Sequence, residues 1–300
     1  MVQKEQFSAV GDGLLVRAPA KINLSLLIAG KREDGFHELE TIMAKVDLFD
    51  EILIEQGRRP GIELACRGPC WAPDGKNNLV YKACEMLLDH CGSRADIKIT
   101  LTKNIPAGSG LGSASSDAAA ALMGVNRFLQ LAIDSETLSR LAAGLGSDAA
   151  FFMNGPLAFC TGRGERIEKL GENFNFCALL IMPDVSVSTK KVYANYKHDW
   201  TIYERLSAKI KNLMEKNRID LVCGMCANML ETSCFGFYKE LGEFKDRIES
   251  LGIRPVCLSG SGSTLFWLAD VSDRQNAEEN RRKLEEKVDC KSVIVSNNRW

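Results

Sequence analysis

Several short stretches in the first hundred residues alternate between apolar and polar side chains. In the clearest, from Asp96 to Leu101, isoleucine or leucine occupies every second position and lysine or threonine stands between them. A period of two is typical of a strand with one buried face. After an irregular start over residues 1–13, similar runs predict strands over Leu14–Ala18, Ile22–Ile28, Thr41–Val46, Glu51–Glu55 and Ile62–Ala65.

Apolar residues at helical spacing predict three helices in the same half of the chain. One covers Leu79–Cys91, a second runs from about Ser115 to Leu131, and a third from about Ser135 to Leu145. Ser135 is a suitable N-cap for the third helix, and Gly146 lies just past its end.

The second half of the chain mixes both patterns. Strands are predicted over Leu157–Thr161, Ala178–Met182, Val256–Ser259, Thr264–Leu268 and Ser292–Val295, and helices over Ile202–Glu215, Phe237–Ser250 and Arg274–Lys287. No internal repeat or coiled coil is present. Strands and helices in irregular order, with hairpins, indicate an α+β fold. We predict two domains, residues 1–165 and 166–300.

Composition excludes several classes of protein. The 300 residues are 45% hydrophobic, which suits a folded core, and 38 basic against 39 acidic residues leave a net charge of −1. A chain without net positive charge lacks the field of a dedicated nucleic-acid binder. The sequence contains no apolar run of the roughly 18 residues that a membrane span requires and no signal-peptide core. We therefore expect no nucleic-acid or membrane partner and a cytoplasmic location.

Eleven cysteines are present, an odd number at irregular spacing. Such a pattern argues against a secreted disulfide framework, so reduced thiols are expected. Cys223 and Cys226 have the C-x-x-C spacing of a zinc or redox site, but no second pair or nearby histidine completes a ligand set. Packing within a helix is the preferred interpretation of this pair. His90 and His198 likewise have no partner at metal-ligand spacing.

A glycine-rich segment between a predicted strand and a predicted helix is the strongest chemical signal. Backbone that carries no Cβ can approach a polyphosphate closely, and the free amides of a helix N-terminus attract anions. Nearby hydroxyls can bind phosphate oxygens or Mg²⁺, although the sequence does not choose among the serines. The segment predicted to bind nucleotide phosphates consists of Pro106, Ala107, Gly108, Ser109, Gly110, Leu111, Gly112, Ser113, Ala114, Ser115 and Ser116.

Two common phosphate motifs do not fit this segment. A Walker A loop requires a lysine after the glycines, and a dinucleotide fingerprint requires a third glycine where Ser115 stands. Composition alone leaves open that the segment is only a flexible connection.

Three motifs in order along the chain give a more specific indication. With Pro19–Asn23, Pro106–Ser116 and Leu258–Ser263, the sequence resembles the GHMP kinase superfamily. The segments Lys31–His37 and Gly146–Phe152 are similar to the branch that phosphorylates 4-diphosphocytidyl-2-C-methyl-D-erythritol in the non-mevalonate isoprenoid pathway. The chain departs from that branch at Phe36, where tyrosine is usual, at Ala149 and Ala150 in place of Val-Pro, and at Ser113-Ala114 in place of two glycines.

The resemblance implies a two-domain fold and a phosphotransfer site. The N-terminal domain is expected to resemble domain 2 of ribosomal protein S5, and the C-terminal domain to be ferredoxin-like. ATP and Mg²⁺ are the implied cofactors. Asp148 would be the general base, although composition alone allows a simple turn residue after a helix. Lys21, which needs a carboxylate partner if buried, would pair with Asp148 and polarise the hydroxyl of the substrate.

Four further residues are expected to bind the substrate. Asn23 shares a strand face with Lys21 and can hydrogen-bond the substrate. His37 would read the edge of a cytosine while Phe36 stacks on it, although a core aromatic and a capping histidine are equally compatible with these residues. Thr189 would contact the methylerythritol or its diphosphate, or else cap a helix. Asn78 and Lys103 are weaker candidates for the border of the adenine.

Other functions stay open at this point. The chain can be another GHMP kinase, acting on mevalonate, homoserine or a sugar, or a catalytically silent relative that senses a ligand. We expect a small-molecule substrate, the cytidyl diphosphate of methylerythritol, and a monomer or homodimer.

Overall fold

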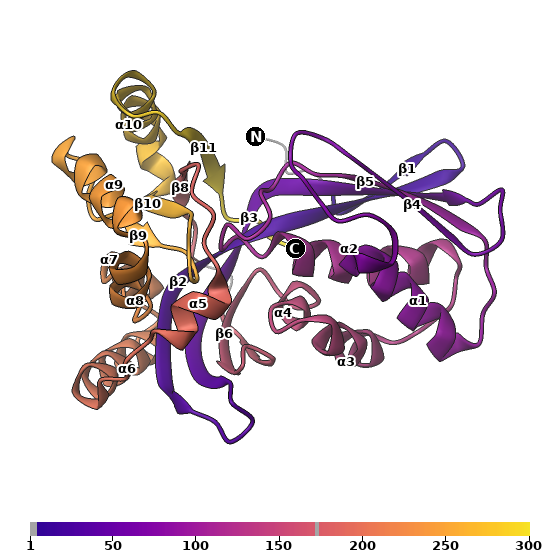
Figure 1. The fold of residues 1–300 in the computed structure, drawn as a ribbon, viewed down its shortest axis with the longest axis horizontal. Coiled ribbons are helices and arrows are strands. Elements are labelled where there is room, and N and C mark those ends of the chain that lie inside the picture. Colours follow the sequence, from indigo (N-terminus) through magenta and orange to yellow (C-terminus); the bar gives the residue numbers. More distant parts are fainter. Residues whose placement is uncertain (1–4, 172–173) are drawn as a thin grey trace.

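The computed structural model describes residues 5–171 and 174–300 and contains two β-sheets with helices packed around them (Figure 1). Within these residues no helix combines the length and apolar character that crossing a membrane would require. The mixed order of helices and strands confirms the predicted α+β class.

The first sheet is built on two long antiparallel strands that run through the middle of the molecule (Figure 1). The neighbouring strands pair with either end of these two. Pro19 has no N–H to donate, and the register of the long pair shifts next to it, between Pro19 and Ala20. The strands are β1 (Phe7–Val10), β2 (Gly13–Lys31), β3 (His37–Gln56), β4 (Ile62–Arg67), β5 (Ile97–Thr102), β6 (Leu157–Gly162) and β7 (Arg166–Lys169).

Helices α1 (Leu79–Cys91), α2 (Ser113–Phe128) and α3 (Ser135–Leu145) cover one end of this sheet, and the short α4 (Ala149–Phe152) follows them. Their apolar faces meet the strands in one core, which includes Val16, Ile54 and Ile99 from the sheet and Ala118 and Leu87 from the helices. The alanine-rich face of α2 lets this helix lie close to the sheet, which fixes the position of its N-terminus.

The second sheet has the strand order β11-β8-β10-β9 and packs against the other end of the long strands. Its core joins Ile22 and Ile42 of the first sheet to Leu180 and Phe266 of the second. The strands are β8 (Cys177–Met182), β9 (Cys257–Leu258), β10 (Leu265–Ala269) and β11 (Lys291–Ser296). The helices are α5 (Thr189–Ala194), α6 (Trp200–Glu215), α7 (Ile219–Gly224), α8 (Glu231–Phe237), α9 (Lys239–Ser250) and α10 (Arg274–Lys287), and two 3₁₀ turns cover Gly75–Asn77 and Val271–Asp273.

Several predicted elements differ from those observed. The two strands predicted on either side of Pro19 form the single strand β2, and Thr41–Val46 and Glu51–Glu55 both lie within β3. Part of the supposedly irregular start forms β1, and the helix predicted from Phe237 begins at Lys239, after the separate helix α8. The division at residue 165 stays a prediction, and the β6–β7 hairpin spans it.

Candidate active site

The glycine-rich loop connects β5 to α2, as predicted. Gly108, Gly110 and Gly112 have positive φ angles of 68°, 80° and 72°, and α2 begins directly after them at Ser113. The hydroxyl of Ser109 donates to the carbonyl of Pro106 at 2.7 Å and closes the turn. The first amides of a 16-residue helix therefore lie at the end of a loop that exposes little besides backbone, which is a suitable site for an anion.

A second glycine-rich turn, Ser259–Ser263, packs directly against this loop. A Cβ atom on Gly110 would lie 2.1 Å from the carbonyl oxygen of Ser259, so only glycine fits there. The hydroxyl of Ser259 donates to the carbonyl of Gly110 at 3.0 Å, and the backbone N–H of Thr264 donates to the carbonyl of Ser109 at 3.0 Å. The second turn thus supports the phosphate loop from the C-terminal part of the chain.

Lys21 joins these two segments to the predicted base. Its ammonium donates to Asn23 Oδ1 at 2.6 Å and to the carbonyl of Gly110 at 2.9 Å, and it lies 3.5 Å from Asp148 Oδ2. The lysine side chain is 4% exposed and that of Asp148 is 34% exposed. The expected carboxylate partner is therefore present, and three motifs that are far apart in the sequence meet at one ammonium group.

Asn23 is buried beside Lys21 and holds it in place. Its Nδ2 donates to Thr41 Oγ1 at 2.8 Å, and its backbone N–H donates to Ser259 Oγ at 3.3 Å. Both ends of the side-chain amide already have protein partners. Its predicted contact with the substrate stays a prediction, whereas its contact with Lys21 is observed.

Asp148 stands at the start of the four-residue helix α4. The carbonyl of Asp148 accepts the N–H of Phe151 at 3.2 Å, and the N–H of Ala149 donates to Gly146 at 3.1 Å. These bonds fix the backbone while one carboxylate oxygen faces Lys21 and part of the group stays open to solvent. A carboxylate that is held but accessible can accept a proton from a bound alcohol.

His37 and Phe36 lie at the beginning of β3, next to two aromatic side chains of the C-terminal domain. The ring centroid of His37 is 5.3 Å from that of Tyr193 and 5.8 Å from that of Tyr196. Phe36 is 52% exposed, and the guanidinium of Arg163 lies 5.0 Å from its ring centroid. The core interpretation of Phe36 is therefore wrong, and its ring is available for stacking.

His37 is neutral near pH 7. Partial burial lowers the pKa of its imidazole, and the charges of Lys31 and His198 lower it further. A neutral imidazole offers one donor and one acceptor, which suits the recognition of a base edge and needs no change of charge.

Thr189 binds to the second glycine-rich turn. Its Oγ1 lies 2.8 Å from Ser261 Oγ, and the N-cap of α5 is Ser188, whose hydroxyl accepts the N–H of Lys191. The cap interpretation of Thr189 is therefore wrong. Tyr193 follows one turn later on the same helix face, and burial together with the Asp148 carboxylate raises the pKa of its phenol. The spacing of four residues from Thr189 was the only sequence signal that could have identified Tyr193.

A buried charge cluster lies beneath the phosphate loop. The ammonium of Lys103 contacts Asp50 Oδ2 and Ser113 Oγ and lies 2.6 Å from Asp117 Oδ2. Burial alone would lower the pKa of Lys103, but the two carboxylates outweigh it and raise that pKa. Burial and the neighbouring Asp50 raise the pKa of Asp117. The ammonium of Lys103 and the hydroxyl of Ser113 are therefore both held by protein partners in the core, and the place of Lys103 at the border of the adenine stays a prediction.

Asn78 has a structural role at the start of α1. Its Oδ1 accepts the N–H of Val80 at 2.9 Å as the N-cap of α1, and its Nδ2 donates to the carbonyl of Pro73 at 2.8 Å. That it also borders the adenine stays a prediction.

The fit of Mg²⁺ depends on the serines at the start of α2. Ser109 and Ser113 have protein partners, whereas the hydroxyl of Ser116 is buried and has none. Within the described ranges no group of three or more acidic, histidine or cysteine side chains could hold a metal. Mg²⁺ in kinases takes most of its ligands from phosphates and water and few from protein. A single unpartnered hydroxyl beside the phosphate loop fits that pattern.

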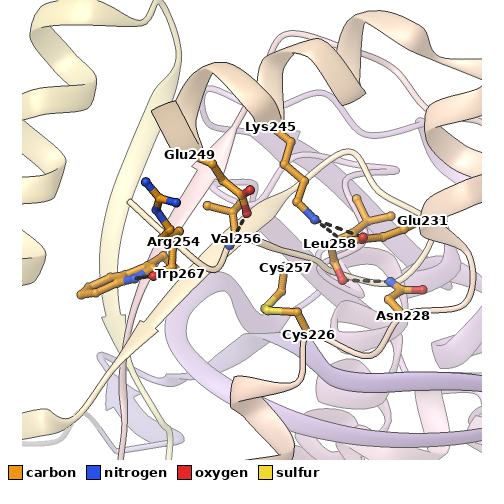
Figure 2. Close-up of a disulfide and its surroundings, with 10 residues drawn as sticks. All are labelled: Cys226, Asn228, Glu231, Lys245, Glu249, Arg254, Val256, Cys257, Leu258 and Trp267. Carbon is orange, nitrogen blue, oxygen red and sulfur yellow. Dashed lines mark hydrogen bonds and ion pairs between the residues drawn. A yellow bond between two sulfur atoms is a disulfide. The ribbon is translucent and has the colours of Figure 1, made fainter. Parts of the chain in front are cut away.

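A disulfide between Cys226 and Cys257 stands behind the second glycine-rich turn, and Figure 2 shows it with its neighbours. The expectation of reduced thiols is wrong for this pair, because folding brings together two cysteines 31 residues apart. Asn228, beside Cys226, donates through Nδ2 to the carbonyls of Leu258 and Gly260 at 2.9 and 2.8 Å. The disulfide and the amide both tie the α7–α8 segment to the turn. The packing interpretation holds for Cys223, a buried free thiol of α7, and is wrong for Cys226, which lies beyond the end of that helix and forms the disulfide.

The sequence and the structure were compared with known proteins. The sequence profile of the GHMP kinases N terminal domain matches residues 78–156, and that of the GHMP kinases C terminal domain matches residues 210–290. The chain belongs to the GHMP kinase family. A curated relative from Bacillus cereus named 4-diphosphocytidyl-2-C-methyl-D-erythritol kinase is 36% identical over 263 residues, which cover 88% of this chain and 90% of that relative.

Solved structures agree with this assignment. A crystal structure of 4-(cytidine 5'-diphospho)-2C-methyl-D-erythritol kinase is 30% identical, covers 95% of this chain and 99% of its own, and superposes with a TM-score of 0.74. A homoserine kinase from Cytophaga hutchinsonii has the same TM-score at 19% identity, with 99% of this chain and 98% of its own covered, and shows the fold alone. The resemblance to GHMP kinases and the predicted two-domain fold are thereby confirmed.

Proposed function

We propose that this GHMP kinase transfers the γ-phosphoryl group of ATP to the 2-hydroxyl of 4-diphosphocytidyl-2-C-methyl-D-erythritol, a step of the non-mevalonate route to isoprenoid precursors. The observation that carries the proposal is the pairing of Lys21 with Asp148 beside the phosphate loop, with the aromatic group of Phe36, His37 and Tyr193 at the other end. The similarity to the named relative supports the choice of substrate.

The phosphoryl-transfer step needs a cradle, a proton acceptor and a cation. The phosphate loop and the N-terminus of α2 bind the triphosphate, and Asp148 accepts the proton of the 2-hydroxyl as the new P–O bond forms and the bond to ADP breaks. The Lys21 ammonium, 3.5 Å from Asp148 Oδ2, stabilises the alkoxide that develops on the substrate. The products are ADP and the 2-phosphate of the substrate.

Mg²⁺ would be held by the phosphates of ATP together with the hydroxyl of Ser116, and would offset the charge on the β- and γ-phosphates. The hydroxyl is the one atom of the loop serines that is buried with no hydrogen-bond partner among the described residues.

At the other end of the site, the cytosine would stack between Phe36 and Tyr193. His37 would bind the base edge, and Thr189 would bind the diphosphate or the methylerythritol. The ring of His37 lies 5.3 Å from that of Tyr193 and the ring of Phe36 is exposed, which supports this arrangement.

The test is an ADP-release assay with purified protein, ATP and Mg²⁺ across four alcohols. We expect turnover with 4-diphosphocytidyl-2-C-methyl-D-erythritol. The rates with mevalonate, homoserine or galactose should be at most about 1% of that rate, because an alcohol without cytidine leaves polar groups of the site unpaired. Phosphorus NMR of the product should show a new monoester on the 2-oxygen. A preference for an alcohol without cytidine would reject the proposed substrate, and no turnover with any alcohol would favour a silent ligand sensor.

A further inference from the structure

Two buried lysines stand side by side on the long strands, and the mechanism above uses only one of them. Lys21 of β2 and Lys45 of β3 are direct partners in the antiparallel register. Residues opposite each other in such a pair have their side chains on the same face of the sheet. Both residues are almost fully buried, with Lys21 at 3% and Lys45 at 1% exposure.

The two lysines contact opposite ends of the same short helix. The ammonium of Lys21 faces Asp148, which precedes α4, whereas that of Lys45 donates to the carbonyls of Phe152 and Asn154 at 3.0 and 2.6 Å. Lys45 therefore holds the C-terminal end of the helix whose first end carries the proposed base.

These carbonyls would otherwise have no partner. The last carbonyls of a helix cannot be satisfied within it. Here the N–H of Met153 and the Nδ2 of Asn154 both donate to the carbonyl of Ala150. The N–H of Asn154 donates to the carbonyl of Phe151. The carbonyls of Phe152 and Asn154 receive the Lys45 amine instead. Without it, the end of α4 would keep two weakly solvated acceptors near the core.

The surroundings of Lys45 are costly for an ion. No carboxylate pairs with Lys45 in the part of the chain that the structure describes, and the ring centroid of Phe151 lies 5.8 Å from its ammonium. Burial, together with the charge of Lys169, lowers the pKa of Lys45 to about 7. A neutral amine still has two N–H groups for two carbonyls, so the contact to α4 persists in either charge state.

We propose that Lys45 is a positioning residue that fixes α4, and thereby Asp148, against Lys21. The proposal rests on the role of Asp148 as the general base. Because a proton acceptor must be placed to within a fraction of an ångström, a shift of α4 acts on the chemical step and not on the binding of either substrate.

The test is a double-mutant cycle with Lys45→Met and Asp148→Asn, using radiolabelled ATP so that slow turnover is measurable. Lys45→Met should lower kcat by roughly 10- to 100-fold, the range for a small misplacement of a catalytic group, with both KM values within about 2-fold of the parent. In the Asp148→Asn background, the same change should lower kcat by less than about 2-fold, because the group that Lys45 positions is already gone.

Two variants complete the design. Lys169→Met removes an exposed cation near Lys45 without touching α4 and should leave kcat unchanged. Lys45→Gln keeps a hydrogen-bond donor and should retain several-fold more activity than Lys45→Met. If the methionine variant does not fold, the glutamine variant takes its place in the double-mutant cycle.

Some results would overturn the proposal. An equal loss of kcat from Lys45→Met in both backgrounds, or a loss of thermal stability with unchanged kcat, would show that Lys45 only supports the fold. If Asp148→Asn alone left kcat unchanged, the base assignment and the positioning role would both fail. The proposed substrate would be unaffected, because it is tested separately by identifying the product.

Discussion

Two lysines contact the phosphate loop, and they differ in how completely hydrogen bonds and carboxylates neutralise their ammonium groups. Beneath the loop, Lys103 is buried against Asp50, Asp117 and Ser113, and all three are themselves buried. On the other side, Lys21 shares its ammonium among Asn23, a loop carbonyl and a carboxylate 3.5 Å away that is partly open to solvent. A buried cluster whose charged groups all have partners stabilises the fold. A charge pair with a solvent-accessible carboxylate can take part in proton transfer.

The comparison predicts that changes on the open side alter rate and changes beneath the loop alter stability. The largest expected effect is that of Asp148→Asn. Removing the proton acceptor should lower kcat by roughly 10²- to 10⁴-fold, the usual contribution of a general base. The dissociation constant of ATP, measured by calorimetry, should stay within about 2-fold, because the substitution keeps the size of the side chain and leaves the phosphate loop unchanged.

The melting temperature of Asp148→Asn is the control, and it should match that of the parent. The general-base assignment fails if the variant turns over as fast as the parent enzyme. A large fall in melting temperature would instead show that Asp148 stabilises the fold. Asp148 and Lys103 would then have the same role.

The second prediction concerns Lys103→Met. This change leaves Asp50 and Asp117 buried and close together without a counter-charge, and breaking a buried pair in this way costs about 3–5 kcal/mol. The free energy of unfolding, from urea titration, should fall by this amount. Because burial and Asp50 already raise the pKa of Asp117, the loss should be greater at pH 8 than at pH 5, where that carboxyl is more readily protonated.

An exposed lysine of the same sheet, Lys98, pairs with Glu55 at the surface and provides the matched control. Lys98→Met should change the free energy of unfolding by less than about 1 kcal/mol. Equal effects of the two substitutions would contradict the structural role of the buried cluster.

Much of this arrangement was predictable from the sequence, because the informative residues are local. The alternation in Ile97–Thr102, the helical spacing in Leu79–Cys91 and the glycines of the phosphate loop each describe their own segment. The resemblance to the family, through Pro19–Asn23 and Gly146–Phe152, then placed Lys21 and Asp148 together, although 127 positions separate them in the sequence.

What the sequence missed depends on contacts between distant segments. Pro19 suggested a break between two strands, but a register shift in the pair with β3 lets one strand continue through it. Nothing local shows that Asp50 and Asp117 share Lys103, that Cys226 meets Cys257, or that Lys45 ends beside α4. Ser113 stands among predicted phosphate ligands, yet its position on α2 turns the hydroxyl toward the core.

The third prediction tests the support behind the second glycine-rich turn. Without reduction, the unfolded protein should show nine reactive thiols, and eleven after reduction. Cys226→Ser should lower the free energy of unfolding by about 3.7 kcal/mol, the loop-closure contribution of a bridge that spans 31 residues. Its KM values should change by less than about 2-fold, because Asn228 still binds the carbonyls of the turn.

The matched control is Cys91→Ser, which removes a free, half-buried thiol. It should leave both the free energy of unfolding and the effect of reductant unchanged. If eleven thiols react without reduction, the two cysteines are not joined in solution.

The smallest predicted effect is on substrate recognition. His37→Ala should raise the KM for the cytidyl substrate by about 10-fold, equivalent to about 1.4 kcal/mol, and change kcat and the KM for ATP little. The reason is that the imidazole lies beside Tyr193 and Tyr196, in the aromatic group proposed to bind the cytosine. His90→Ala, at an exposed position of α1, is the control and should change none of these constants. A fall in kcat with an unchanged KM would show that His37 acts in the phosphoryl-transfer step and not in substrate binding. The separation of the site into a recognition end and a catalytic end would then be wrong.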